Sequence, residues 1–351
     1  MSAFIWKATG LVMIVLNNVS CQYKFAKKVF DDLNIQFNDS EIVSVLGDEE
    51  SGKSTLFKIF IGMEQYTGTV LYDGELLRKK PDEIIALYSQ HALFSSYSVK
   101  YNLVYPLKIR KVKKEDISIK LNEVVEYLQL QGILTKKIYK LSEYEKIKVC
   151  LGRLLIRDAK YYLVDDAFRK LAGEEREHAF HLFKQIAEEL KNKKKTVLYF
   201  TRNKEETLEI ADKICVVANC ELKEFEDKGK IIEDPQNVYS VIALKNKNNI
   251  LTCDIMNDKL IDRMGEIAGL KKDKILGDRT SVYAYIPEDA FIAGNDNIFK
   301  VKETNLIGDR YLHTLTNSMT IISDKPTNEI SFDIDMSKVM YFDIPIGSRI
   351  K

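Results

Sequence analysis

Short apolar runs alternate with amphipathic stretches through the first two thirds of the chain. The runs 42–46, 161–166 and 196–201 are rich in β-branched and aromatic residues, which is typical of strands buried on both faces. Residues 172–191 repeat apolar positions at helical spacing, with acidic residues early and lysine late. This alternation predicts an α/β domain in which helices cover a parallel sheet.

The pattern changes twice along the chain. Residues 91 to about 155 show helical periodicity without a buried-strand run, which indicates a helical insertion. After Pro235, Gly, Pro, Asn and Asp separate short strand-like runs, which is typical of a small β-barrel or sandwich. We therefore expect an α/β domain over residues 13–240 and a β-rich domain over residues 241–351. The β-rich runs are 281–286, 311–316, 319–323 and 338–344.

Composition narrows the class of protein. The 351 residues, of which 45% are hydrophobic and 30% charged, are enough for about two globular domains. The formal net charge of +1 gives no reason to expect nucleic acid as a partner. The five cysteines lack CxxC spacing, which fits reduced thiols of a cytosolic protein better than a zinc site or disulfide framework.

The start of the chain shows no targeting or membrane segment. The apolar run 11–16 is too short to span a bilayer and lacks the flanks of a signal peptide. The recognisable pattern begins just after Met13, so Met1 and Met13 are both candidate start residues. Any role at a membrane is therefore expected to come through partner chains.

A glycine-rich loop with the spacing GxxxxGK[ST] follows the strand-like run 42–46. Glycines let backbone amides curl around phosphates, the lysine would reach the β and γ phosphates, and the hydroxyls would ligate Mg²⁺. An ordinary strand–turn–helix with glycines is the alternative, but the strand before the loop and the helical run 54–60 after it favour phosphate binding. The candidate residues are Gly47, Ser51, Gly52, Lys53, Ser54 and Thr55.

Three acidic residues, Asp48, Glu49 and Glu50, lie inside this loop. One interpretation is that their carboxylates point away from the phosphates and are tolerated. The other is that they weaken nucleotide binding. A carboxylate turned inward at about 4 Å would cost at most roughly 4 kcal/mol per charge pair at an effective dielectric near 20.

Further motifs follow in a fixed order. Tyr23 ends the run 18–23, a strand–turn segment spans 67–74, Gln90 follows a strand-like run, and the apolar run at 161 ends in Asp165. In this order they resemble the ATP-binding subunit of an ABC transporter, of the sugar-importer type. The resemblance covers nearly the whole chain from about residue 13.

The resemblance implies a P-loop NTPase domain of ABC type with a helical insertion, followed by an OB-like β-barrel known as a TOBE domain. It implies that Tyr23 stacks on adenine, that Gln90 senses Mg²⁺ and water, and that Asp165 holds Mg²⁺ through water. A strand-end tyrosine and a strand-end polar residue are the alternatives for Tyr23 and Gln90. Residues 286–289 and 338–350 resemble C-terminal segments of sugar-type subunits, although Ile286 replaces an arginine. These segments favour a sugar as the solute.

Four positions depart from the family pattern. The signature loop, usually LSGGQ, reads LSEYE at 141–145, where Ser142 is kept and Glu143 and Tyr144 replace glycines. In the family this loop caps the γ-phosphate bound by the opposite subunit, so Ser142 would act in trans. The catalytic glutamate is replaced by Asp166, a base shorter by one methylene group, and a misplacement of that size can cost about 100-fold in rate.

The other two departures lie after the buried runs 196–201 and 161–166. Arg202 lies where the family has its switch histidine, and arginine cannot share a proton near neutral pH although it can contact phosphate. Ala172 lies where the family has an aspartate that signals across the dimer. If two copies of this chain paired, both sites would be damaged. If it pairs with a complete subunit, the losses are shared between the two sites.

Three functions are compatible with these residues. The first is an importer subunit with weak ATPase activity. The second is a non-hydrolysing subunit of an asymmetric dimer, and the third is a soluble ATP-binding regulator. ATP and Mg²⁺ are the expected cofactors. The first two functions also imply a peripheral location at the cytoplasmic face of the membrane. They also imply permease subunits, a second nucleotide-binding subunit and, indirectly, a solute-binding protein as partners.

Overall fold

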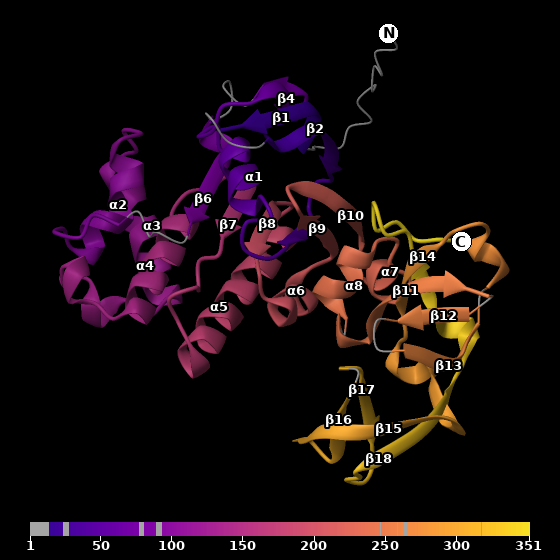
Figure 1. Cartoon of the computed structure of the whole chain (residues 1–351). Helices are drawn as coiled ribbons and strands as arrows, with labels where there is room; N and C mark the ends of the chain where they lie inside the picture. Colours follow the sequence, from indigo (N-terminus) through magenta and orange to yellow (C-terminus); the bar gives the residue numbers. More distant parts are fainter. Residues whose placement is uncertain are drawn as a thin grey trace. The chain divides into compact units, whose positions relative to one another are not determined.

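The computed structural model describes residues 14–23, 28–76, 81–88, 93–245, 247–257, 259–262, 265–271, 273–316 and 318–351. By contacts the chain divides into two compact units, residues 1–228 and 229–351 (Figure 1). The division lies before the change of pattern at Pro235. The predicted fold class is confirmed, since an α/β unit with a largely parallel sheet is followed by a strand-rich unit.

The first unit is built on a six-stranded sheet in the order β10-β9-β3-β8-β7-β6. Strands β9, β3, β8, β7 and β6 are parallel, and β10 pairs antiparallel at one edge. The strands are β3 (Ile42–Leu46), β6 (Ile84–Tyr88), β7 (Tyr161–Asp165), β8 (Thr196–Thr201), β9 (Lys213–Ala218) and β10 (Glu221–Asp227). Every residue of β3, β7 and β8 is buried, as their apolar runs predict.

A second, antiparallel sheet of the first unit has the order β2-β1-β4-β5. Its strands are β1 (Ile14–Gln22), β2 (Lys28–Phe37), β4 (Thr67–Tyr72) and β5 (Glu75–Leu76). The helix α1 (Lys53–Phe60) packs between the two sheets, because Leu56, Phe57 and Phe60 share one apolar core with residues of both. This packing fixes where the glycine-rich loop begins and ends.

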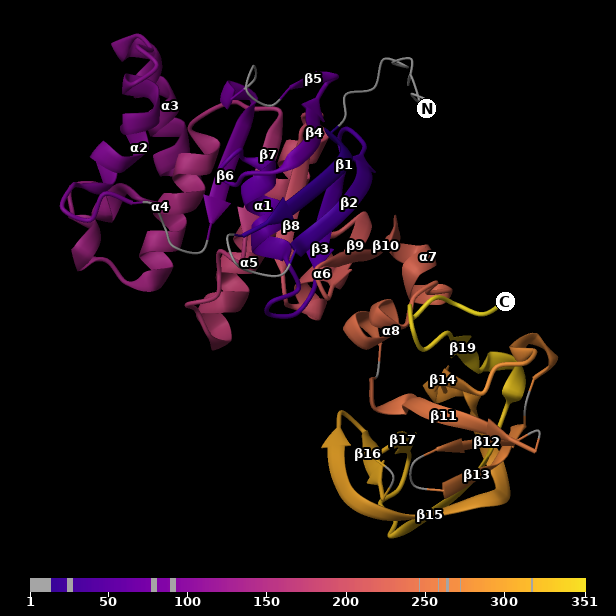
Figure 2. The ribbon, with the colours of Figure 1, turned by 45° about the horizontal axis from the view of Figure 1, so that its top comes forward.

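Three helices form the predicted insertion: α2 (Val99–Lys108), α3 (Lys114–Tyr127) and α4 (Glu143–Leu155). They lie beside β6 in both ribbon views, and their apolar faces share one core with β7, β8 and α5 (Gly173–Asn192) (Figure 2). The helix α6 (Lys204–Ile210) follows β8. Within the described residues, no helix is long and apolar enough to cross a membrane.

The second unit contains two antiparallel sheets, in the orders β13-β12-β11-β14-β19 and β17-β16-β15-β18. Residues of both sheets, among them Val282 and Phe332, share one apolar core. The elements are α7 (Lys228–Glu233), which begins at the unit boundary, α8 (Val238–Leu244), β11 (Ile250–Met256), β12 (Lys259–Asp262), β13 (Gly265–Lys271), β14 (Ser281–Tyr285), β15 (Phe291–Ile307), β16 (Arg310–Leu315), β17 (Thr320–Ser323), β18 (Glu329–Ile334) and β19 (Met340–Phe342).

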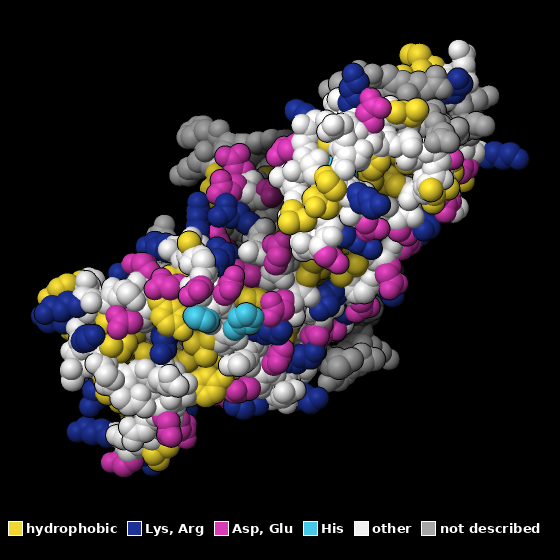
Figure 3. Space-filling view, turned by 90° about the horizontal axis from the view of Figure 1, so that it is seen from below, with side chains coloured by type: hydrophobic (Ala, Val, Ile, Leu, Met, Phe, Trp, Pro, Cys, Tyr) yellow, Lys and Arg dark blue, Asp and Glu magenta, His cyan; other side chains and the backbone are white. Residues whose placement is uncertain are grey.

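The predicted β-rich runs appear as β14, β16, β17 and β19, and the last of these is shorter than its run because residues 336–338 form a 3₁₀ turn. On the face shown in Figure 3, Lys and Arg side chains are interspersed with Asp and Glu side chains. This mixture agrees with the near-neutral net charge of the sequence.

Candidate functional site

The glycine-rich loop connects β3 to α1 and depends on its two glycines. A Cβ atom on Gly47 would lie 2.2 Å from the carbonyl oxygen of Val217, so no larger residue fits without a backbone shift. Gly52 is the N-cap of α1 and has φ of +101°, a left-handed conformation that favours glycine. No side chain caps α1, and its first turn holds no acidic residue. The first amides of α1 are therefore open to an anion.

Lys53 is folded back into this loop. Its side chain is 7% exposed, and Nζ donates to the carbonyl oxygens of Gly47 and Asp48, at 2.5 and 2.6 Å, and to Oγ of Ser51 at 3.1 Å. Burial lowers the pKa of Lys53 to about 8, although the charges of Asp165 and Asp48 act in the opposite direction. The ammonium group is thus mainly charged at neutral pH and lies at the loop centre.

Two aspartates at the end of β7 line the same cleft, Asp165 as the last residue of the strand and Asp166 as the residue after it. Burial, followed by the charge of Asp166, raises the pKa of Asp165 to about 6, and a hydrogen bond from Ser54 opposes this effect. Burial also raises the pKa of Asp166, and the charge of Arg202 is the largest opposing effect. Asp166 has φ of +42°, an uncommon conformation for a residue other than glycine. Ser54 and Asp165 both line the cleft, and a hydroxyl and a carboxylate are oxygen ligands of the kind that Mg²⁺ prefers.

Glu49 is turned toward two arginines at the same cleft. Its Oε1 atom lies 2.5 Å from Nη1 of Arg202 and 3.2 Å from Nη2 of Arg169. Nε of Arg202 also lies 3.8 Å from Oδ2 of Asp166. The arginine at the switch-histidine position is therefore paired with an acid of the phosphate loop.

These groups line one open cleft of about 470 Å³. Among the described lining side chains, five are acidic and three are basic, which gives these eight a formal charge of −2 when all are ionised. The described lining residues are Val29, Asp48, Glu49, Glu50, Ser51, Gly52, Lys53, Ser54, Thr55, Asp165, Asp166, Arg169, Arg202 and Cys220. The structure thus brings together most of the sequence-predicted phosphate and metal residues in an acidic cleft.

The remaining sequence-predicted site residues are not among the described residues that line this cleft. Oη of Tyr23 lies 3.1 Å from Oγ1 of Thr55, so the tyrosine reaches the end of the phosphate loop. Gln90 lies outside the described residues. Ser142 is the N-cap of α4 and is not among the described residues that line the cleft.

The signature segment, residues 141–145, forms hydrogen bonds between its own residues. The Ser142 hydroxyl accepts a hydrogen bond from the amide of Glu145 at 3.1 Å, and the Glu145 carboxylate accepts one from the amide of Ser142 at 2.9 Å. This reciprocal pair is a capping box. Glu143 in the same turn forms an ion pair with Lys146 at 2.7 Å. Two amides of this helix start are therefore bonded within the chain, beside two carboxylates.

The residues at the cleft suit Mg²⁺ only together with a nucleotide. Among the described residues, no group of three or more His, Cys, Asp and Glu side chains could hold a metal ion. Mg²⁺ is commonly bound by one or two carboxylates plus substrate phosphates. The pairing of Ser54 with Asp165 beside the open amides of α1 fits that arrangement.

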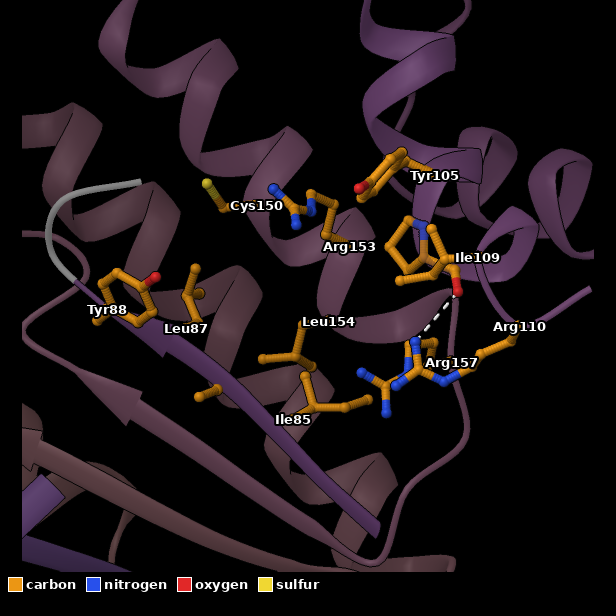
Figure 4. A pocket seen from close by; sticks show the side chains of 12 residues that line it. Ile85, Leu87, Tyr88, Tyr105, Ile109, Arg110, Cys150, Arg153, Leu154 and Arg157 are labelled. Atoms are coloured by element: carbon orange, nitrogen blue, oxygen red, sulfur yellow. Dashed lines mark hydrogen bonds between the residues drawn. The ribbon is translucent and has the colours of Figure 1, made fainter. Parts of the chain in front are cut away.

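A second pocket of about 300 Å³ lies between β6, α2 and α4 (Figure 4). Arg110, Arg153 and Arg157 line it together with apolar side chains such as Ile85 and Leu154. Burial lowers the pKa of Arg153 and of Arg157. None of the sequence-predicted site residues that the structure describes lines this pocket.

Sequence reasoning missed Glu49 as a partner of arginine, and it missed Arg169 and Cys220 as lining residues. Glu49 lies 120 residues from Arg169 and 153 from Arg202, so no local spacing signals the pairs. The capping box did have a signal, because Ser142 and Glu145 stand at the S-x-x-E spacing.

Comparisons with known proteins show the family of this chain. A model of the ABC transporter family matches residues 30–169. The sn-glycerol-3-phosphate import ATP-binding protein of Bartonella bacilliformis is 31% identical over 233 residues, which cover 65% of this chain and 67% of that protein. The chain thus spans about two thirds of the length of that relative.

Two further proteins are similar to this chain, one in sequence and one in structure. The trehalose/maltose import ATP-binding protein of Thermococcus litoralis is 24% identical over 355 residues, covering 91% of this chain and 94% of that protein. The structure of cbiO1 from Clostridium perfringens, described as part of an ABC transporter complex, superposes with a TM-score of 0.56 at 18% identity. It covers 63% of this chain and 90% of the cbiO1 chain, and it supports the fold alone.

Proposed function

Because this chain belongs to the ATP-binding subunits of ABC importers, we propose that it binds Mg-ATP in the cleft between the phosphate loop and the end of β7. The observation that carries this proposal is the start of α1, where no side chain caps the backbone amides and the Lys53 ammonium group is bonded into the preceding loop. Backbone amides and one charged lysine are the groups that hold a triphosphate in a loop of this spacing.

The site residues have separate roles in this proposal. Gly47, Ser51, Gly52 and Lys53 hold the phosphates. Ser54 and Asp165 hold the metal, with Gln90 as a further candidate ligand, and bound Mg²⁺ would neutralise charge on the β and γ phosphates. Tyr23 stacks on the base, Thr55 supports the loop end, Arg202 contacts the γ-phosphate, and Ser142 contacts the nucleotide of an opposite subunit.

We propose that hydrolysis is weak or depends on a partner. Asp166 is a short base, and the Arg202 guanidinium lies 3.8 Å from its carboxylate, which keeps that carboxylate engaged in an ion pair. The capping box at Ser142 leaves fewer amides to approach a γ-phosphate across a dimer. Bound but uncleaved ATP would still stabilise a closed dimer by its binding free energy.

We propose a sugar as the solute and a location at the cytoplasmic face of the membrane, with permease subunits and a second nucleotide-binding subunit as partners. A solute-binding protein would be an indirect partner. The segment 338–350 and the similarity to a trehalose/maltose import protein over most of both chains support the sugar. A non-hydrolysing subunit of an asymmetric dimer is the second candidate, favoured by the closed start of α4.

Affinity purification of the tagged full chain from its native membranes tests the transporter assignment. We expect integral-membrane permease chains and a nucleotide-binding subunit to co-purify in an ATP-dependent manner. Recovery of the chain in the membrane-free fraction, without permease chains, would favour the soluble regulator instead. Turnover of the isolated chain, compared with turnover of the purified complex, separates weak intrinsic hydrolysis from partner-dependent hydrolysis.

A further inference from the structure

We propose that Glu49 is an internal competitor of the nucleotide, whose carboxylate occupies the arginine pair that would otherwise bind the terminal phosphate. This inference rests on the proposed function, because it assumes that the cleft receives a nucleotide. It adds Arg169 as a second phosphate-binding residue and assigns Glu49 a role in regulating affinity.

The geometry places one carboxylate oxygen between two guanidinium groups. Oε1 of Glu49 lies 2.5 Å from Nη1 of Arg202 and 3.2 Å from Nη2 of Arg169. Both arginines line the cleft, as do Lys53 and Asp165. Guanidinium groups bind carboxylates and phosphates through the same planar donors. A carboxylate held in this position therefore satisfies the donors that a phosphate would use.

The ion pairs of Glu49 with the two arginines affect how tightly the cleft can bind a nucleotide. Of the three cationic side chains among the described lining residues, Lys53 is bonded to loop carbonyls and the two arginines are paired with Glu49. A terminal phosphate that enters the cleft must displace Glu49 from Arg202 and Arg169, or bind without them. The cost of breaking the pairs is subtracted from the affinity for the nucleotide.

The pairs are weak enough to exchange. The side chains of Glu49, Arg169 and Arg202 are 63%, 58% and 37% exposed, and exposed ion pairs shift an equilibrium by at most about fivefold each. A phosphate with two negative charges is a stronger partner for two guanidinium groups than one carboxylate. Glu49 should therefore lower the affinity for ATP without abolishing binding, and should affect ADP less because ADP lacks the terminal phosphate.

Glu50 supplies a matched control. It lies next in the loop, lines the same cleft and carries the same charge, but among the described residues its carboxylate forms no ion pair. Replacing either glutamate by glutamine removes one negative charge from the loop. Only Glu49→Gln also removes the ion pairs that Arg169 and Arg202 form with the loop.

The experiment is isothermal titration of the full chain with Mg-ATP and with Mg-ADP. The proteins are the wild type, Glu49→Gln, Glu50→Gln, and both glutamine variants in an Arg169→Gln/Arg202→Gln background. We expect Glu49→Gln to tighten ATP binding about fivefold more than Glu50→Gln does, with a smaller effect on ADP. This excess should vanish in the background that lacks the arginines.

The competitor role is overturned if the two glutamine variants bind ATP equally, or if the gain of Glu49→Gln persists without the arginines. Lys53→Ala distinguishes this failure from failure of the proposed function. If wild-type binding depends on Lys53 while the glutamine variants agree, only the role of Glu49 is wrong. If Lys53→Ala binds ATP as well as the wild type, the nucleotide site itself is elsewhere and both proposals fail.

Discussion

Two helices of the first unit, α1 and α4, begin at motifs that together enclose a nucleotide in ABC proteins, and their starts differ. The start of α1 has a glycine N-cap, no side-chain cap and no acid in its first turn. The start of α4 has a serine N-cap, a closed capping box and two acids, Glu143 and Glu145. The amides at one helix start are available to an anion, and those at the other are already partly bonded.

We propose that this difference separates nucleotide binding from nucleotide hydrolysis in this chain. Binding a triphosphate needs open amides, a cation and room, all of which the loop at Gly47–Thr55 provides. Hydrolysis needs a base at the right distance and a second anion-binding helix start from the facing subunit. The chain retains the first set of groups and has altered the second.

Restoring the family residues at the altered hydrolysis positions should have the largest effect, which we expect on ATP turnover. A variant with Asp166→Glu, Arg202→His, Glu143→Gly and Tyr144→Gly regains the longer base, the titratable side chain and the glycines of the signature. We expect ATP turnover by the purified chain to rise about 100-fold, as measured by phosphate release. The single Glu143→Gly variant is the control, and equal turnover by the two would show that the losses lie elsewhere.

The loop conformation itself should be the next most sensitive feature. In Gly47→Ala the new Cβ would meet the Val217 carbonyl oxygen at 2.2 Å, so the backbone must shift. We expect the free energy of unfolding to fall by about 1–3 kcal/mol and ATP binding to weaken. Gly132→Ala, whose Cβ would meet nothing within 4 Å, should change the free energy of unfolding by less than about 0.5 kcal/mol. Unfolding in urea measures both, and equal losses would contradict the proposed constraint.

The buried carboxylate of Asp165 should make stability depend on pH. Its folded-state pKa of about 6 lies above the unfolded value near 4, so the folded state binds the proton more tightly. Stability should therefore fall as pH rises from about 4 to about 6, and the cost should persist above pH 6.

Asp165→Asn removes this ionisation and tests the sign. In EDTA at pH 7.5 we expect the variant to be more stable than the wild type by about 1–2 kcal/mol, with the difference shrinking toward pH 4. Chemical unfolding at the two pH values provides the measurement. A wild type that is more stable than Asp165→Asn at pH 7.5 would mean that the charged carboxylate stabilises the apo fold.

The smallest expected effect concerns the cap of α4. Ser142→Ala removes the hydroxyl that accepts from the Glu145 amide, and we expect a loss of about 1 kcal/mol in the free energy of unfolding. ATP affinity of the isolated chain should stay the same, because Ser142 does not line its own cleft. A large loss of ATP affinity with unchanged stability would place Ser142 in the binding site of the same chain.

The sequence predicted what depends on local pattern. Buried apolar runs predicted β3 and β8 at their observed bounds, and helical periodicity predicted α5 to within one residue at each end. The glycine spacing predicted the loop around Lys53, because such a loop is specified by consecutive residues.

Contacts between distant segments could not be predicted in this way. The Glu49–Arg202 pair joins the phosphate loop to the segment after β8, and only the parallel order of β3 and β8 brings their ends together. The three loop acids have the same charge, and the sequence does not distinguish the one that meets arginine from its neighbours. The capping box at Ser142 and Glu145, by contrast, depends on residues three apart in the sequence.

The most direct test of the account is a paired measurement of ATP affinity and ATP turnover for the wild-type chain and Lys53→Ala. We predict that the wild type binds Mg-ATP, that the variant binds it at least tenfold more weakly, and that phosphate release by the wild type stays close to that of the variant. Equal affinity of the two proteins would contradict the phosphate site, and rapid Lys53-dependent hydrolysis by the isolated chain would contradict the separation of binding from cleavage.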